Sequence, residues 1–187
     1  MSAFDYLAVL ISIVLGLGIA QILTGIADLV RARDRVTPFA PTFFQMGNMF
    51  LIHLQMWWSM FGLRHLQDWT FPMFLFTLMQ PVLLYLMTAF LVPQVPAEGP
   101  LDMETAYFRE RAWFSAALFA SVVVSLTRST LTDGHLPEPA NLAAHGLFAV
   151  LGIAGVVARS RRVHLFLAPA FSVVLVLYVA VLFANLR

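Results

Sequence analysis

Six apolar segments, each long enough to cross a bilayer as a helix, take up most of this 187-residue chain. A transmembrane helix needs about 20 mainly apolar residues, and its backbone must satisfy its own hydrogen bonds because lipid offers none. The chain is 11% charged, whereas about a quarter of the residues of a soluble domain are charged. We therefore predict an all-α, polytopic integral membrane protein with a single transmembrane domain over residues 1–187. Its six helices are expected at residues 4–30, 38–63, 70–92, 113–131, 140–158 and 163–186.

The arginines predict how these helices are oriented. The expected loops on one side of the membrane hold eight arginines, namely Arg31, Arg33, Arg35, Arg109, Arg111, Arg159, Arg161 and Arg162. The other side holds three, namely Arg64, Arg128 and Arg187. Because cytoplasmic loops are enriched in basic residues, we expect both termini on the outer side. A bacterial cytoplasmic membrane is the expected location, and the lipid bilayer is the expected surrounding.

Composition excludes several classes of chemistry. The chain has no cysteine and no lysine, so thiolate metal sites, disulfides and Schiff-base cofactors are ruled out. A net charge of +1 without a basic cluster argues against a nucleic-acid partner. No hydrolase motif, zinc-protease motif or phosphate-binding loop occurs, so the chain is not expected to be an enzyme.

The segment at residues 38–63 is expected to hold the functional site, because it is unusually polar. At about 100° per residue its side chains sort into three faces. One face carries Met46, Met49, His53, Met56 and Met60, and a second carries Gln45, Asn48, Gln55 and Ser59. The third face is aromatic and apolar and suits contact with lipid. Amides and an imidazole find no partner in lipid, so the first two faces should turn toward other helices.

A small channel or transporter is the function that these polar groups favour. Uncharged hydrogen-bonding side chains can line a wet path across the membrane. The expected path is lined by Gln21, Gln45, Asn48, Gln55, Ser59 and Gln80. Pro81 follows Gln80 in the middle of its segment and removes a backbone donor there. Broken or kinked helices often mark transport sites, but an isolated proline kink is more often only a packing feature.

A haem-binding electron-transfer subunit is the first alternative. His53 and His145 are expected at matched depths on different helices, where they could ligate the iron of haem b from both sides. Arg64 and Arg128 would then pair with the haem propionates. A related alternative is copper, because the thioethers of Met49 and Met56 and the imidazole of His53 suit Cu(I).

An accessory subunit without a site of its own is the remaining alternative. Gly16, Ala20 and Thr24 recur every four residues and predict close approach of another helix, hence a homo-oligomer or a membrane partner subunit. In this interpretation the histidines and amides serve only helix packing.

Three expectations concern the helix ends. Asp28 should pair with Arg31 or Arg35, and His65 and His164 should be solvated. Asp102 should cap a separate interfacial helix that runs into the segment at residues 113–131.

Overall fold

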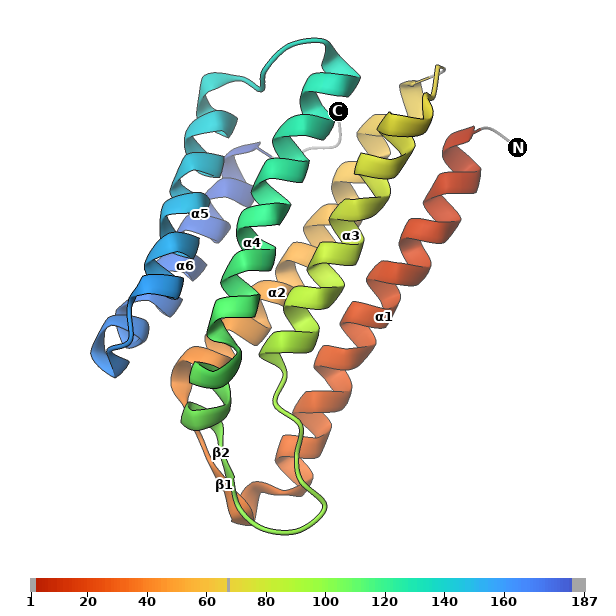
Figure 1. Ribbon diagram of the computed structural model, residues 1–187. Helices are drawn as coiled ribbons and strands as arrows, with labels where there is room; N and C mark the ends of the chain where they lie inside the picture. The colour runs from red at the N-terminus through yellow and green to blue at the C-terminus, as the bar shows by residue number, and fades with distance from the viewer. Residues whose placement is uncertain (1–2, 67, 183–187) are drawn as a thin grey trace.

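The structure is a computed structural model that describes residues 3–66 and 68–182. The described residues form six long helices that run side by side (Figure 1). They are α1 (Ala3–Arg31), α2 (Ala40–Ser59), α3 (Phe71–Leu91), α4 (Met103–Asp133), α5 (Pro139–Val157) and α6 (Arg161–Leu182). The all-α, six-helix prediction is confirmed, while the expected end of the last helix, at residues 183–186, lies outside the described residues, as does Arg187.

Five of these helices, α1, α3, α4, α5 and α6, are long and apolar enough to cross a membrane. The fold is therefore that of a multi-pass membrane protein. α2 is not among the five, because its three amides and His53 lower its hydropathy. It nevertheless packs between α1, α3 and α6, so its polar side chains are sheltered by apolar neighbours.

α4 differs from its expected bounds, because it is one unbroken helix and not a short interfacial helix joined to a transmembrane one. The Asp102 carboxylate caps it as predicted, accepting hydrogen bonds from the Glu104 backbone at 3.0 Å and from the Thr105 hydroxyl at 2.6 Å. No proline or glycine follows until Gly134, whose φ of 72° ends the helix. The helix continues because nothing in between breaks it.

Two loops are tied together at the end of the bundle that we call the strand end. Here β1 (Val36–Thr37) pairs in parallel with β2 (Leu101–Asp102), as seen at the bottom of Figure 1. Arg35, in the 3₁₀ turn Arg33–Arg35, donates hydrogen bonds to the carbonyls of Ala97 and Gly99 at 3.2 and 3.0 Å. The sequence did not predict this pairing, because two residues per strand leave no alternating pattern.

The opposite end of the bundle, which we call the far end, holds the start of α1, the end of α4 and the α4–α5 connection (Figure 1). A second 3₁₀ helix, Met60–His65, continues α2 there. The sequence predicted one helix that ends at residue 63. In the structure the α-helix ends at Ser59, and the last turns are a 3₁₀ helix.

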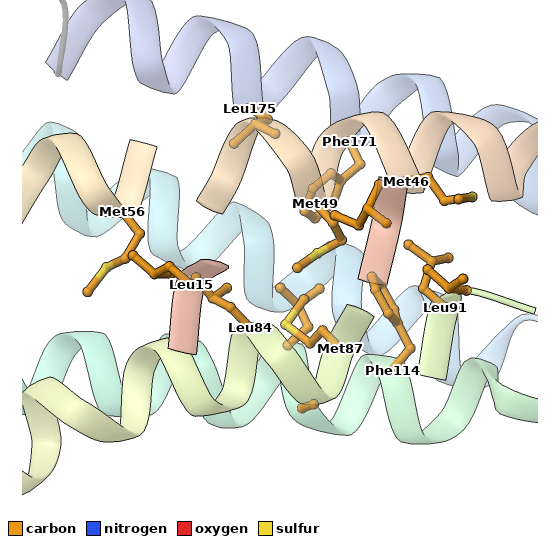
Figure 2. Close-up of a cluster of buried hydrophobic side chains, with 14 of the residues drawn as sticks. Leu15, Met46, Met49, Met56, Leu84, Met87, Leu91, Phe114, Phe171 and Leu175 are labelled. Atoms are coloured by element: carbon orange, nitrogen blue, oxygen red, sulfur yellow. The ribbon is translucent and has the colours of Figure 1, made fainter. Parts of the chain in front are cut away.

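The apolar core gathers side chains from all six long helices, and Figure 2 labels some of those from α1, α2, α3, α4 and α6. In Figure 2, Met56, Met49 and Met46 of α2 lie across from Leu84, Met87 and Leu91 of α3. Flexible thioethers fill the irregular space between helices. The third face of α2 is exposed as predicted, with Phe43, Phe44, Leu54, Trp58 and Phe61 between 39% and 46% accessible.

The small-residue stripe of α1 does not serve packing within this chain. Gly16, Ala20 and Thr24 are exposed, whereas Gly18 and Gly25 are buried against α2 and the end of α3. Self-association through the stripe stays a prediction. At the strand end, Asp28 pairs with Arg31 at 2.8 Å, so that prediction is confirmed.

Candidate functional site

Two cavities lie inside the described part of the bundle, between helices α2 to α6. The larger one, of about 120 Å³, is toward the far end and is called the Arg128 cavity. The smaller one, of about 30 Å³, is toward the strand end and is called the Tyr107 cavity. All five helices line each cavity, and Leu118 and Phe171 line both. The two cavities therefore meet at this apolar pair.

Polar side chains are concentrated in the Arg128 cavity. They come from all five helices and all can form hydrogen bonds: Gln55, Ser59, Gln80, Ser121, Ser125, Arg128, His145 and Tyr178. No aspartate or glutamate is among the described residues that line it. The cavity thus holds one fixed positive charge and no negative one.

The hydrogen bonds of His145 fix its tautomer. Its Nδ1 lies 2.8 Å from the Asn141 carbonyl, which can only accept, so Nδ1–H is the donor. Its Nε2, 2.9 Å from Ser125 Oγ, therefore accepts the serine proton. The Tyr178 hydroxyl donates to Asn141 Oδ1 at 3.4 Å, and its ring meets the imidazole edge to face. This side of the cavity is held by a connected network.

Two polar atoms of the same cavity have no hydrogen-bond partner among the described residues. Gln80 Nε2 donates to Ser121 Oγ at 2.7 Å, which leaves the buried Oε1 of Gln80 unpaired. The buried Nε of Arg128 is unpaired as well, and no carboxylate of the described residues forms a salt bridge with this arginine. Buried polar atoms are nearly always satisfied, so one missing donor and one missing acceptor in one cavity indicate space for a ligand or water.

The Tyr107 cavity contains a second buried histidine. His164 is only 1% exposed, so the prediction that it is solvated was wrong. Its Nε2–H donates to the Ala158 carbonyl at 2.9 Å, and its Nδ1 accepts from the Tyr107 hydroxyl at 3.0 Å. The rings of Tyr107 and Phe108 enclose it edge to face, because the unbroken start of α4 brings both rings against α6. His65 is exposed, as predicted.

The predicted path residues are divided between the two cavities. Gln55, Ser59 and Gln80 line the Arg128 cavity, and Gln45 lines the Tyr107 cavity. Asn48 lies next to this path, because its amide donates to Gln45 Oε1 at 3.1 Å. Gln21 is half-buried on α1 and lines neither cavity. The amide face of α2 thus reaches both cavities.

The residues predicted to hold haem are separated. His145 and Arg128 line the Arg128 cavity, but His53 does not. His53 is fully buried, donates through Nδ1–H to the Met49 carbonyl at 2.7 Å, and has its unpaired Nε2 directed against Gly18 of α1. Arg64 is exposed and lies 3.6 Å over the Phe61 ring. Haem ligation by both histidines stays a prediction, and it would require both imidazoles to leave these positions.

The residues predicted to hold copper lie in the apolar core. Met49 and Met56 are buried among hydrophobic side chains (Figure 2), and His53 contacts the Met49 backbone and not its sulfur. Within the described ranges, no three histidine, aspartate or glutamate side chains come close enough to hold a metal ion. Copper binding by the thioethers stays a prediction.

Several cavity residues of α4, other than Arg128, were not predicted from the sequence. One face of α4 lines both cavities, at spacings of three and four residues: Tyr107, Arg111, Phe114, Leu118, Ser121, Ser125 and Arg128. This periodicity is visible in the sequence. It was overlooked because the first half of the face falls in a segment that was interpreted as interfacial.

Comparison with known proteins adds no relative from which a function could be transferred. No protein-family model matches the chain, and no curated protein or solved structure matches it either. The function is therefore inferred from the two cavities and the residues that line them.

Proposed function

We propose that the protein lets a small polar solute cross the membrane through the Arg128 and Tyr107 cavities. The observation that supports this most is that the two cavities meet at Leu118 and Phe171 inside one ring of five helices. The α4 face from Tyr107 to Arg128 covers roughly 30 Å at 1.5 Å per residue. This length is about the thickness of the hydrocarbon core, so polar lining is available from one boundary to the other.

The number of polar groups supports a transport role over a purely structural one. Groups that hydrogen-bond are costly to keep inside a bilayer, and they usually face a cavity that water or substrate enters. In the Arg128 cavity one buried donor and one buried acceptor are left without protein partners. A polar solute or water that enters the cavity would offer partners to both.

Leu118 and Phe171 act as the barrier of the proposed path. Both are buried, at 7% and 3% exposure, and neither side chain can form a hydrogen bond. α5 approaches α4 closely here: a methyl group placed on Gly152 would lie only 3.2 Å from Leu118 Cδ2. A hydrophobic constriction excludes water and so closes a path to polar solutes.

Solute flux into proteoliposomes tests this proposal. Light scattering would follow the uptake of small polar solutes, including glycolate, glycerol and urea, by vesicles that contain the full chain. Leu118→Asn keeps four non-hydrogen atoms branched at Cγ but makes the constriction polar, so it should raise the flux at least several-fold. Val123→Ala is the control, because Val123 is exposed on another face of α4. Flux equal to that of empty vesicles for the wild type and for Leu118→Asn would refute the proposal.

A further inference from the structure

We infer that the Arg128 cavity binds a small α-hydroxy carboxylate, a monoanion with a hydroxyl group next to its carboxylate. Only one part of the inference rests on the proposed function, namely that this ligand is the solute that crosses the membrane. Binding itself is deduced from the unpaired atoms, the charge and the volume of the cavity.

The charge of the cavity requires an anionic ligand. A guanidinium remains charged at all accessible pH values, and a buried charge is unfavourable unless an opposite charge compensates it. The nearest acidic side chain along α4, Asp133, accepts hydrogen bonds from the hydroxyls of Ser129 and Thr132 at 3.0 and 3.1 Å. Asp133 acts on the Arg128 charge through space, but it forms no salt bridge with the guanidinium, and neither it nor another described carboxylate lines the cavity. A counter-charge in direct contact with Arg128 is therefore expected from a ligand, and a carboxylate matches the fork of donors on this side chain.

The unpaired oxygen of Gln80 requires a donor on the same ligand. This Oε1 can only accept, and the amide nitrogen of the same side chain is already bound to Ser121 at 2.7 Å. Chloride or acetate would satisfy Arg128 but leave Gln80 unpaired. A ligand that carries a hydroxyl on the carbon next to its carboxylate offers an anionic acceptor to Arg128 and a donor to Gln80, both of which line this cavity. An α-ammonium group would also donate, but it would leave the positive charge of the cavity uncompensated.

The volume of the cavity matches a ligand of a few non-hydrogen atoms. The cavity measures about 120 Å³. An apolar cavity of about 150 Å³ holds benzene, with six carbon atoms. Glycolate, with five non-hydrogen atoms, therefore fits. A dicarboxylate is disfavoured, because its second charge would meet the apolar part of the lining, Leu84, Met87 and Phe148.

Isothermal titration calorimetry on the detergent-purified full chain tests the inference. The probes are glycolate, acetate, glycolamide and glycine. Glycolate should bind most tightly, acetate less tightly because it lacks the hydroxyl, and neutral glycolamide and zwitterionic glycine most weakly. Equal affinities for glycolate and glycolamide would overturn the inference, because the charge would then play no part.

Variants separate the contributions of the two unpaired groups. Arg128→Gln should weaken glycolate binding about tenfold or more, as expected for a lost hydrogen bond to a charged group. Gln80→Leu should keep acetate affinity but remove the preference of glycolate over acetate. Arg64→Gln is the control, because Arg64 is an exposed arginine at the same end of the bundle that lines neither cavity. Should Arg128→Gln fail to fold, Arg128→Lys keeps the charge without the fork and should bind glycolate more weakly than the wild type.

The outcomes distinguish the inference from the proposed function. Glycolate binding without flux through proteoliposomes would support the inference and refute transport. Flux of neutral solutes without binding of any of the four probes would refute the inference and leave transport standing. The anion could also come from a lipid headgroup, so phosphatidylglycerol is added as a fifth probe. Binding of this lipid with no response to glycolate would overturn the inference.

Discussion

Replacement of Gly18 by alanine is expected to destabilise the bundle by forcing α1 away from α2. A Cβ at this position would overlap the Nε2, Cδ2 and Cε1 atoms of His53. The ring has little room to retreat, since it is fully buried and its Nδ1–H is bound to the Met49 carbonyl at 2.7 Å. The contact is therefore relieved only by moving a helix or by breaking that hydrogen bond.

The magnitude follows from two opposing contributions. Overpacking a filled core reduces the free energy of unfolding by about 1–3 kcal/mol. The change from glycine to alanine in a helix adds back at most about 1 kcal/mol. Because three ring atoms are overlapped, we expect a net loss of about 2 kcal/mol for Gly18→Ala. Gly16 is the matched control, as it lies one half-turn away on the same helix with no atom near an added Cβ. Gly16→Ala should leave the stability unchanged or raise it by up to about 1 kcal/mol.

Reversible unfolding in mixed detergent micelles, followed by circular dichroism, measures both variants. The double variant Gly18→Ala, His53→Ala provides the decisive comparison, because removal of the imidazole leaves space for the new methyl group. The double variant should lose at least about 1 kcal/mol less unfolding free energy than the two single variants lose together, as expected for residues in direct contact. Equal effects of Gly16→Ala and Gly18→Ala, or strict additivity in the double variant, would show that the two helices do not meet at this contact.

Two further predictions concern other contacts. Gly25→Ala should destabilise the protein by about 1–3 kcal/mol, because the added Cβ would collide with Val92 at the end of α3. Gly47→Ala is the control and should not destabilise it, because the space around Gly47 is open. The same unfolding assay compares the two variants. The hydrogen bond from the Thr105 hydroxyl, together with backbone donors, lowers the pKa of Asp102 below its ordinary value of 3.8. The ionised Asp102 carboxylate therefore stabilises the fold above that pH, and this stabilisation is lost as the pH falls through the lowered pKa. Wild type should therefore lose thermal stability below about pH 3.8 relative to Asp102→Asn, which cannot titrate; identical pH profiles would contradict this cause.

Hydropathy was sufficient to predict the five apolar helices, α1 and α3 to α6, because lipid leaves the backbone few alternatives. The periodicity of α2 also predicted that Phe43 and Trp58 face outward and Gln45 inward, as the structure confirms. Periodicity cannot say which neighbour each inward face meets. His53 faces α1, whereas Gln45 faces the Tyr107 cavity. The haem hypothesis depended on His53 and His145 sharing one space.

The small residues of α1 illustrate the same limit. A regular spacing of small side chains predicts close approach, but it does not identify the helix that approaches. Within the chain, Gly18 and Gly25 make the close contacts, and the more regular stripe around Gly16 remains exposed. The sharing of one cavity by Arg128 and Gln80 was beyond prediction for a related reason. It depends on the pairing of α3 with α4, which no local pattern encodes.

The polarity of α2 has a consequence for how the protein is made. A segment with amides and an imidazole near its centre partitions poorly into a bilayer as a single helix. α1 precedes it directly, is far more apolar, and offers the groove at Gly18 that receives His53. We therefore expect α1 and α2 to leave the translocon together, as a packed helical hairpin. The groove would then be needed during biosynthesis, before either cavity exists.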